Sequence, residues 1–355
     1  MKYYFAPLEG ITGHIYRRAH HTFYPGMNRY YAPFIVPKEK KYLSTKERND
    51  VCLEHNSGMM LIPQIMTNRP EEFLRISRLL NEEYGYQEIN LNLGCPSKTV
   101  VSKKRGSGFL AEPDLLERFL IQVCDGLEPY NMKLSVKTRI GKESSDEFFR
   151  LLEIFAQIPL SELIVHPRLQ KNFYDGEPDL NVFAQAYTIS PKVNWELCYN
   201  GDLFQNTDYW RLCKRFPKLS AVMLGRGLLT NPMLVEDIKV RENGCIHGSG
   251  AKEAVLQRFQ SAKEEKAERK RRYEMYRMIC EEYMAVMSGE NTVLFKMKEL
   301  WFYMCQDFTL YQSYWKKMKK VKKLADFDRI VIALCEEQRL QEHILADNSS
   351  DLHEI

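Results

Sequence analysis

Short apolar segments alternate with longer helix-like segments over the first 224 residues of the chain. Each apolar segment ends in glycine, proline or polar residues, and we expect eight of them to be strands: 3–6, 29–32, 59–64, 88–91, 133–137, 162–166, 195–199 and 221–224. Residues 70–84 and 113–127 between them have helical apolar spacing and begin with proline, which suits the first position of a helix. Eight strand–helix repeats predict an α/β fold, the (β/α)₈ TIM barrel.

A doubly wound open sheet is the alternative to the barrel. That fold carries G-x-G-x-x-G after its first strand when it binds a dinucleotide. Here the first expected strand is followed by Pro7-Leu8-Glu9-Gly10 instead. We therefore favour the barrel.

The composition changes after the expected barrel. Asn243-Gly244 and the glycine-containing residues 247–250 predict a linker. Charged or aromatic helix-prone segments follow at 252–287, 292–308, 314–323 and 327–340. We expect a catalytic barrel domain at residues 1–242, a small C-terminal helical bundle domain at 243–340 and a flexible tail at 341–355.

Composition excludes several classes of protein. The net charge is only +4 over 355 residues, and no apolar run is long enough to cross a membrane. Nine scattered cysteines include no C-x-x-C pair, so we expect no metal site. No signal-sequence pattern precedes the first expected strand, which predicts reduced thiols and a cytoplasmic location. The sequence does not indicate the oligomeric state.

The stretch 88–109 carries the most distinctive candidate chemistry. Its strand ends at Gly94-Cys95-Pro96, where glycine and proline fix a turn that presents Cys95 at the strand exit. The basic loop Lys103-Lys104-Arg105 follows and would attract an anion. A free cysteine is more commonly a small buried residue, so Cys95 alone would not indicate a site.

Polar residues and glycines follow nearly every expected strand. In chain order they are Glu9, Gln64, Asn90, Asn92, Lys137, Arg139, His166, Arg168, Asn200, Gly201, Asp202, Gly225, Arg226 and Gly227. In a barrel these positions converge on the C-terminal face, where active sites are built. Each one alone could be a solvated strand end or a turn residue, but together they predict a site.

The last two strand exits predict a phosphate site. Asn200-Gly201-Asp202 and Gly225-Arg226-Gly227 supply backbone amides and a guanidinium in the loops where barrels usually bind phosphate. Gln64, Lys137 and His166 would then approach the polar edge of a planar ring across the barrel mouth. A lysine there would stabilise negative charge on a reduced flavin.

A lysine-rich segment near the C-terminus suggests a second kind of ligand. Lys316, Lys319 and Lys320 belong to a run of six lysines without an interleaved acid, beside Tyr314 and Trp315. Such a surface fits a nucleic-acid backbone with bases that stack. A solvated helix face is the alternative interpretation.

Six motifs, in order, resemble those of the tRNA-dihydrouridine synthases, and they span the whole expected barrel. They are Ala6-Pro7-Leu8-Glu9-Gly10, Asn92-Leu93-Gly94-Cys95-Pro96-Ser97, Val136-Lys137-Thr138-Arg139, Val165-His166-Pro167-Arg168 with Phe173-Tyr174-Asp175-Gly176, Asn200-Gly201-Asp202 and Gly225-Arg226-Gly227. The resemblance implies an FMN enzyme that reduces a uridine of tRNA to 5,6-dihydrouridine, with NADPH as electron donor.

The resemblance also implies roles for single residues. Cys95 would give the proton to uracil C5. The cofactor would be held by Pro7, Leu8, Glu9, Gln64, Lys137, His166, Asn200, Gly201, Asp202, Gly225 and Arg226. The tRNA would be held by Asn90, Asn92, Arg139, Arg168, Lys103, Lys104, Arg105, Lys316, Lys319 and Lys320. An FMN-dependent dehydrogenase of a free pyrimidine and a non-catalytic RNA-binding barrel are the alternatives.

Overall fold

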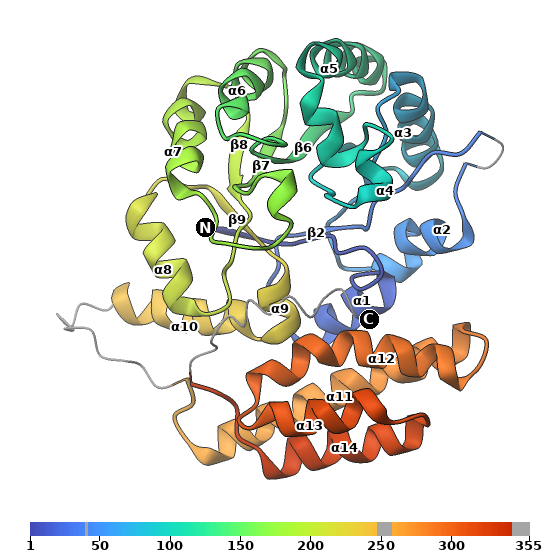
Figure 1. Cartoon of the computed structure of the whole chain (residues 1–355), viewed down its shortest axis with the longest axis vertical. Coiled ribbons are helices and arrows are strands. Elements are labelled where there is room, and N and C mark those ends of the chain that lie inside the picture. Colours follow the sequence, from blue (N-terminus) through green and yellow to red (C-terminus); the bar gives the residue numbers. More distant parts are fainter. Residues whose placement is uncertain (40–41, 247–257, 343–355) are drawn as a thin grey trace. The chain divides into compact units, whose positions relative to one another are not determined.

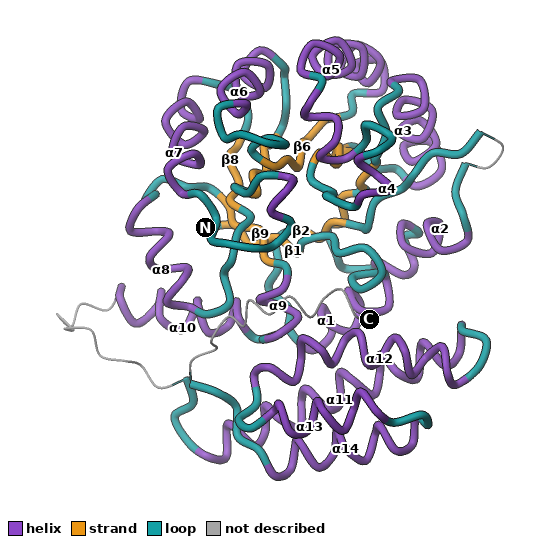
Figure 2. Tube along the Cα trace, in the orientation of Figure 1, coloured by secondary structure: helices purple, strands orange, loops and turns teal. Residues whose placement is uncertain are grey.

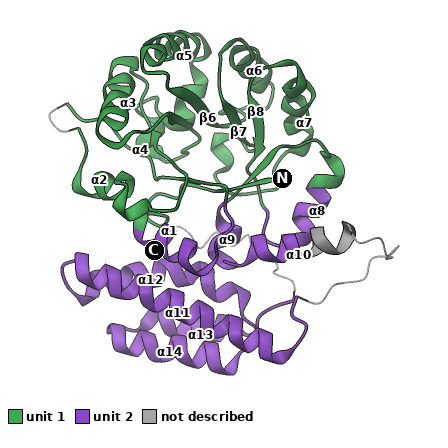
Figure 3. Ribbon diagram, turned by 180° about the vertical axis from the view of Figure 1, so that it is seen from behind, with its two compact units in different colours: residues 1–14, 28–202, 213–224 green, residues 15–27, 203–212, 225–355 purple. Residues whose placement is uncertain are grey.

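The computed structural model describes residues 1–39, 42–246 and 258–342, with side chains for all of these except 241–246. The chain forms two compact units, each assembled from segments that are separate in the sequence (Figure 3). The barrel unit comprises residues 1–14, 28–202 and 213–224, and the helical unit comprises residues 15–27, 203–212 and 225–355. Segments from the first part of the chain therefore take part in both units.

The barrel unit is built on one parallel sheet. Its strands are β1 (Lys2–Phe5), β2 (Arg29–Tyr31), β3 (Leu61–Ile62), β4 (Gln64–Ile65), β5 (Glu88–Leu93), β6 (Lys133–Arg139), β7 (Glu162–His166), β8 (Glu196–Tyr199) and β9 (Ala221–Leu224). Their order is β3-β2-β1-β9-β8-β7-β6-β5-β4, and neighbouring strands run parallel. The strands, orange in Figure 2, are surrounded by helices, which confirms the predicted TIM-barrel class.

The described residues form nine strands where the sequence predicted eight, because Pro63 interrupts the third expected strand. Proline has no backbone N–H and cannot donate to a neighbouring strand. As a result β3 ends at Ile62 and pairs with β2, whereas β4 begins at Gln64 and pairs with β5. The two edges of the sheet are consecutive pieces of one segment, and the sheet closes into a barrel there.

Four helices of 10 to 15 residues lie outside these strands (Figure 1): α3 (Pro70–Tyr84), α5 (Pro113–Leu127), α6 (Glu147–Gln157) and α7 (Leu180–Ile189). Both α3 and α5 have the predicted bounds. Gly85 ends α3 with a φ of 72°, a left-handed conformation that glycine adopts without strain. The shorter helices α2 (Thr45–Val51) and α4 (Lys98–Val101) and the 3₁₀ turn η2 (Gly106–Ala111) lie in loops that follow strands.

The barrel interior is largely apolar. One buried cluster takes side chains from six of the strands: Tyr4, Tyr31, Ile62, Ile164, Cys198, Ala221 and Met223. Leu8, just beyond the end of β1, packs against this cluster. Polar side chains lie beyond this cluster at both ends of the strands, and those at the strand exits form the candidate site.

A buried polar group lies at the other end of the strands. Arg29, Glu88 and Glu162 are the first residues of β2, β5 and β7. The Arg29 guanidinium lies 3.2 Å from the Glu88 carboxylate and 3.6 Å from that of Glu162. The Tyr31 hydroxyl donates a hydrogen bond of 2.7 Å to the Glu162 carboxylate. This group faces away from the strand exits, where barrel active sites are built.

The helical unit contains α9 (Arg226–Thr230), α10 (Leu234–Ile246), α11 (Ala262–Val286), α12 (Glu290–Met304), α13 (Tyr311–Lys320) and α14 (Leu324–Glu337). Helices α1 (His14–Phe23) and α8 (Asn206–Arg215) have residues in both units. The four helices α11 to α14 pack on one another. The predicted C-terminal helical part is therefore confirmed.

The expected domain bounds stay a prediction. The boundary at residue 243 falls inside α10, and residues 247–250 of the expected linker lie outside the described residues. So do residues 343–355 of the expected tail. The two compact units instead divide at residue 225 and at shorter segments near α1 and α8.

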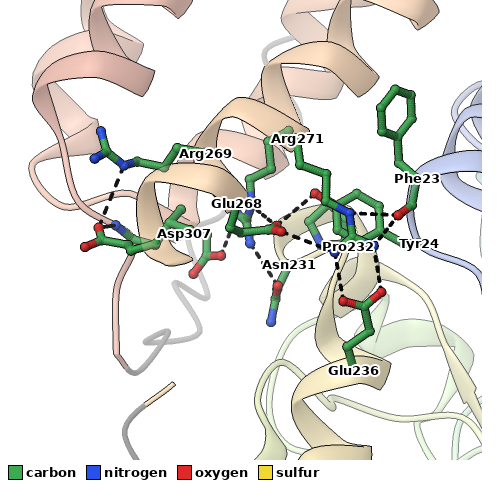
Figure 4. Close-up of polar contacts among 12 residues, drawn as sticks. Phe23, Tyr24, Asn231, Pro232, Glu236, Glu268, Arg269, Arg271 and Asp307 are labelled. Carbon is green, nitrogen blue, oxygen red and sulfur yellow. Dashed lines mark hydrogen bonds and ion pairs between the residues drawn. The ribbon is translucent and has the colours of Figure 1, made fainter. Parts of the chain in front are cut away.

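A partly buried ion network ties the helical unit together (Figure 4). Arg271 of α11 donates to the Glu236 carboxylate at 2.7 and 2.8 Å and to the backbone carbonyl of Phe23 at 2.8 Å. Its guanidinium also lies 3.9 Å from the centre of the Tyr24 ring. The neighbouring Arg272 is buried and donates to Glu268 at 2.9 Å. Much of the charge of α11 therefore faces inward rather than toward solvent.

Candidate active site

The strand register brings the predicted residues of the barrel unit together in pairs. Asn92 of β5 lies opposite Lys137 of β6, and Arg139 of β6 lies opposite His166 of β7. Asn200 follows the last residue of β8, and its backbone N–H bonds to the Val165 carbonyl at 2.9 Å. Because parallel strands end at the same rim, these side chains share the C-terminal face of the barrel.

Three side chains hold the turn that carries Cys95. The side-chain oxygen of Asn92 accepts hydrogen bonds from the backbone N–H groups of Gly94 and Cys95, both at 3.0 Å. Arg139 donates from Nε to the Gly94 carbonyl at 2.9 Å. Ser107 donates from its hydroxyl to the Cys95 carbonyl at 2.8 Å. The position of the thiol is therefore set by groups from two strands and from η2.

A chain of buried amides supports Asn92 from below. Asn92 donates to the side-chain oxygen of Gln64, Gln64 donates to that of Asn90, and both bonds measure 2.7 Å. Asn90 in turn donates to the Ser135 hydroxyl at 2.9 Å. Both polar ends of each amide are used, which gives each side chain one orientation. The contacts with cofactor or tRNA predicted for these three residues stay predictions.

The electrostatics of the rim favour a protonated thiol. Burial raises the pKa of Cys95 above its usual value, although the nearby Arg139 and Lys137 oppose this shift. Burial, together with the Arg139 charge, lowers the pKa of Lys137 to about 8. Cys95 is therefore a thiol at neutral pH, suited to give a proton rather than to attack as a nucleophile.

His166 offers a hydrogen-bond acceptor at the rim. Burial, and after it Arg139 and Lys137, lower its pKa well below the usual value, so the ring is neutral. Its Nδ1 donates to the Asn200 carbonyl at 2.7 Å, which leaves the lone pair on Nε2. That Nε2 is buried and has no hydrogen-bond partner among the residues that the structure describes. A ligand with an O–H or N–H donor would satisfy it.

Arg168 and Asp202 are paired with one another. The guanidinium of Arg168 makes a two-point contact with the Asp202 carboxylate, 3.0 Å long for Nη1. It also donates to the Gly176 carbonyl at 2.5 and 3.2 Å. Because these contacts use most of the guanidinium, the tRNA contact predicted for Arg168 and the cofactor contact predicted for Asp202 stay predictions.

Comparison with known proteins identifies the family. The family model described as "Dihydrouridine synthase (Dus)" matches residues 4–330. The chain belongs to the dihydrouridine synthase family. The match spans the whole barrel, and it confirms the resemblance that the six motifs carry.

Curated relatives agree with the family assignment. The chain is 24% identical over 232 residues to the "tRNA-dihydrouridine synthase B" of Pasteurella multocida, which is 65% of this chain and 67% of that one. It is 33% identical over 161 residues to the "tRNA-dihydrouridine(16) synthase" of Neisseria meningitidis serogroup B, 45% of this chain and 47% of that one. These matches span between about half and two thirds of the relatives. A solved structure of a GH18 chitinase from Pseudoalteromonas aurantia aligns with this chain at 10% identity and a TM-score of 0.44. The alignment covers 68% of this chain and 99% of the chitinase chain. This likeness is too weak to support an argument.

The exit of β1 contributes two largely apolar residues to the candidate site of this family member. Pro7 and Leu8 are half-buried, and Leu8 donates its backbone N–H to the Thr12 hydroxyl at 2.7 Å. Glu9 is exposed and pairs with Lys46 at 2.5 Å. The cofactor contacts predicted for Pro7, Leu8 and Glu9 stay predictions, and the contact of Glu9 would require it to leave Lys46.

The predicted phosphate residues fall in both units of the family member. Gly201 belongs to the barrel unit, and a side chain there would collide with the Tyr199 hydroxyl, since a Cβ would lie 2.0 Å from it. Gly225 and Arg226 belong to the helical unit, where the Arg226 guanidinium lies 5.5 Å from the centre of the Phe204 ring. The common phosphate site of these residues stays a prediction.

The cations of the loop after β5 are largely paired within the barrel unit. Lys104 lies 2.5 Å from Glu112, and Arg105 lies 3.4 Å from Glu72. Lys103 is exposed, and no ion-pair partner is recorded for it in the described part of the chain. The tRNA contacts predicted for these three residues stay predictions.

Three supporting residues were missed from the sequence: Ser107, Ser135 and Tyr174. Tyr174 lies beside two predicted residues, with its ring centre 5.7 Å from the Arg139 guanidinium and 6.3 Å from the His166 ring. Ser107 and Tyr174 do stand within stretches that the sequence singled out: Ser107 bonds to Cys95 of its own stretch, and Tyr174 contacts residues of β6 and β7. No group of three or more His, Cys, Asp or Glu residues in the described ranges could hold a metal ion, and no described helix is long and apolar enough to cross a membrane.

Proposed function

We propose that the chain reduces uridine in tRNA to 5,6-dihydrouridine, with FMN as cofactor and NADPH as electron donor. The observation that carries the proposal is the protonated Cys95 thiol, held at the barrel rim by Asn92 in a member of the dihydrouridine synthase family. Saturating the C5=C6 bond requires a hydride at C6 and a proton at C5. A thiol of raised pKa supplies the proton.

The rim has polar groups that fit FMN. His166 presents a buried acceptor, Nε2, and a ribityl hydroxyl or a ring N–H would satisfy it. Lys137 has no hydrogen-bond or ion-pair partner recorded among the described residues, and its amine would stabilise negative charge on a reduced ring. When bound, FMN would supply the hydride to C6 and would receive one from NADPH.

The chain's own residues bring the proton and the base together. The turn that carries Cys95 is held in place by Asn92, Arg139 and Ser107. The thiol therefore has one position rather than many. A paired base in folded tRNA cannot reach a thiol at a barrel mouth, and the uridine must be extruded to do so. Exposed lysines, among them Lys103 in the loop after the turn, would hold the flanking backbone.

Two measurements test the proposal. The purified protein should be yellow and, with NADPH, should form dihydrouridine in an unmodified tRNA transcript but not from free uridine. Mapping of dihydrouridine in tRNA from cells that lack the protein should show the loss of one or more modified positions. Reduction of free uridine at the same rate as tRNA would favour a free-pyrimidine dehydrogenase instead, and a colourless protein that binds tRNA would favour a non-catalytic barrel.

A further inference from the structure

Helix α11 has a cationic face that the ion network of Arg271 and Arg272 does not use. Lys263, Lys266 and Lys270 are exposed and stand three and four residues apart, so they follow one face of the helix. Within the described residues, neither Lys263 nor Lys266 forms an ion pair. Lys270 forms an exposed ion pair with Glu274 at 3.6 Å. Exposed pairs of this kind add little to stability, so folding alone does not explain the lysines.

A cavity of about 790 Å³ lies between this face and α14. We call it the α11–α14 groove, and its lining residues are Lys263, Lys266, Ala267, Arg269, Lys270, Tyr273, Ile332, Cys335 and Glu336. Four of these nine side chains are cations and only one is an acid. The remaining four give the groove an apolar floor that includes an aromatic ring.

Arg269 gives the groove a fixed shape. Its Nη1 donates to the backbone carbonyls of Cys335 at 2.5 Å and Glu336 at 3.1 Å, in the last turn of α14. Carbonyls at a helix end have no partner within the helix, and a cation there stabilises that end. Arg269 therefore joins the two helices, and the three lysines remain available to a ligand.

We propose that the α11–α14 groove binds an unpaired segment of the RNA substrate, an inference that rests on the function proposed above. Cations repeated along a helix face match the repeated phosphates of a nucleic-acid strand. Tyr273 and Ile332 offer a surface on which an unpaired base can stack, as aromatic side chains do in single-strand binding sites. A base inside a duplex has its faces covered by its neighbours and cannot use this floor, so the groove selects unpaired RNA.

Ala267 allows a test that leaves the fold intact. It is exposed and lies on the groove lining between the lysines, so a longer side chain there meets solvent rather than the core. Ala267→Glu adds one negative charge, and Ala267→Gln adds a side chain of the same shape without charge. We expect the Glu variant to bind an unmodified tRNA transcript about two- to fivefold more weakly than the Gln variant. Equal affinities would overturn the proposal.

The lysines themselves give a second measurement. Replacing Lys263, Lys266 and Lys270 together by Gln should lower the slope of log affinity against log salt by about 2, since a single strand releases roughly 0.7 counterion per phosphate contact. Arg277→Gln is the matched control, because Arg277 lies on the same helix but pairs with Glu281 at 2.6 Å and is not part of the lining. A short unpaired oligoribonucleotide should show the same loss in the triple variant, and its duplex should not.

The outcomes separate this inference from the function on which it rests. If the wild-type protein does not bind tRNA at all, the proposed function fails. If the wild type binds and modifies tRNA but the triple variant has the wild-type salt slope, only the groove proposal fails. NADPH-dependent reduction of the flavin is the internal control and should be unchanged in every groove variant.

Discussion

The side-chain oxygen of Asn92 lies 3.0 Å from the backbone nitrogen of Cys95, two residues beyond the end of the strand that carries Asn92. The same oxygen accepts from Gly94, so one side chain satisfies two backbone donors of the turn. Asn92 is held in turn by Gln64. Its geometry thus gives Asn92 a positioning role, which differs from the tRNA contact that the family resemblance implies.

Asn92→Ala should separate these two roles. Leaving buried backbone donors without a partner costs about 1–3 kcal/mol, and we expect the turn to lose its single conformation. The rate of uridine reduction should fall roughly 10- to 100-fold, with each 1.4 kcal/mol worth a factor of ten, while the Kd for tRNA stays near the wild-type value. Rapid-mixing kinetics and tRNA titration measure the two quantities.

A control for Asn92 is available in the same unit. Asn68 also bonds a backbone group through its side chain, to the Lys103 carbonyl at 3.2 Å, but this contact is exposed. Asn68→Ala should leave the rate of uridine reduction within about twofold, as exposed substitutions usually cost little. A tRNA Kd that weakens in Asn92→Ala as much as the rate falls would instead assign Asn92 to the substrate.

Cys95→Ala should divide the catalytic cycle. If the thiol gives its proton to uracil C5, it has no part in reduction of the flavin by NADPH. The variant should accept a hydride from NADPH at a near-normal rate and bind tRNA, but its reoxidation by tRNA without oxygen should slow about 10²–10⁴-fold, the usual contribution of a general acid. Stopped-flow absorbance follows both steps.

The serine variant makes the Cys95 test sharper. Cys95→Ser keeps the size of the side chain and the backbone contacts to Asn92 and Ser107, so the turn should hold its shape. A hydroxyl is a far weaker acid than a thiol, and reoxidation should be nearly as slow as in the alanine variant. Wild-type reoxidation in either variant would return Cys95 to the role of a packed loop cysteine.

The barrel and the position of its site could be predicted from the sequence because both depend on local patterns. The alternation of strands and helices fixed the fold class, and the bounds of α3 and α5 follow from their proline starts. The ninth strand was missed because Pro63 looked like part of an apolar run. Pro63 divides this segment into β3, which pairs with β2, and β4, which pairs with β5. That arrangement depends on the closure of the sheet.

The partners of the charged residues could not be predicted in this way. Arg168 follows a strand exit, where a cation suggests a ligand, but it is buried against Asp202 from the next strand exit. In the same way, α11 falls in a segment that the sequence marks only as charged and helix-prone, yet its Arg271 and Arg272 face inward. Which acid meets which cation depends on tertiary packing, which periodicity does not encode.

The lysines of α13 should contribute to tRNA affinity through charge. Lys316, Lys319 and Lys320 are exposed, and the described residues include no recorded acidic partner for them. Replacing all three by Gln should lower the salt slope of tRNA binding by about 2–3, because each phosphate contact releases close to one counterion. Fluorescence anisotropy at several salt concentrations measures the slope.

Lys296→Gln is the control for the α13 variant. Lys296 lies on α12 of the same unit, but it pairs with Glu299 at 2.6 Å and so has little charge to offer a phosphate. Its removal should leave the salt slope unchanged. An unchanged slope in the α13 variant as well would make this segment a solvated helix face, and oxidation of NADPH by oxygen should be normal in both variants.

Glu162 should make the stability of the barrel unit depend on pH. Burial is the main cause that raises its pKa from 4.5 to about 7, and the Glu88 charge adds to the shift. The Tyr31 hydroxyl and the Arg29 guanidinium oppose this rise in the pKa. The Tyr4 and Cys198 side chains also face the Glu162 carboxyl. The carboxyl therefore holds its proton in the folded protein at pH values where the unfolded chain has lost it.

The sign of the effect follows from this difference in bound protons. Between about pH 4.5 and 7 the folded state binds more protons than the unfolded state, so the contribution of Glu162 to stability falls as the pH rises through this window. Above pH 7 the full cost of the buried charge is present. One pKa unit corresponds to about 1.4 kcal/mol, so we expect the part of this shift that falls between pH 5 and pH 8 to be worth about 1–3 kcal/mol.

Glu162→Gln isolates this contribution, because a glutamine resembles the protonated carboxyl. Its side-chain oxygen can still accept from the Tyr31 hydroxyl, which lies 2.7 Å from Glu162, and it carries no charge at any pH. Relative to the wild type, the free energy of unfolding of the variant should rise by about 1–3 kcal/mol from pH 5 to pH 8. Urea unfolding at both pH values measures this, with Glu196→Gln as an exposed control that should change by less than about 0.5 kcal/mol. A difference between Glu162→Gln and wild type that stays constant over this range would show that the carboxyl is ionised in the folded protein throughout.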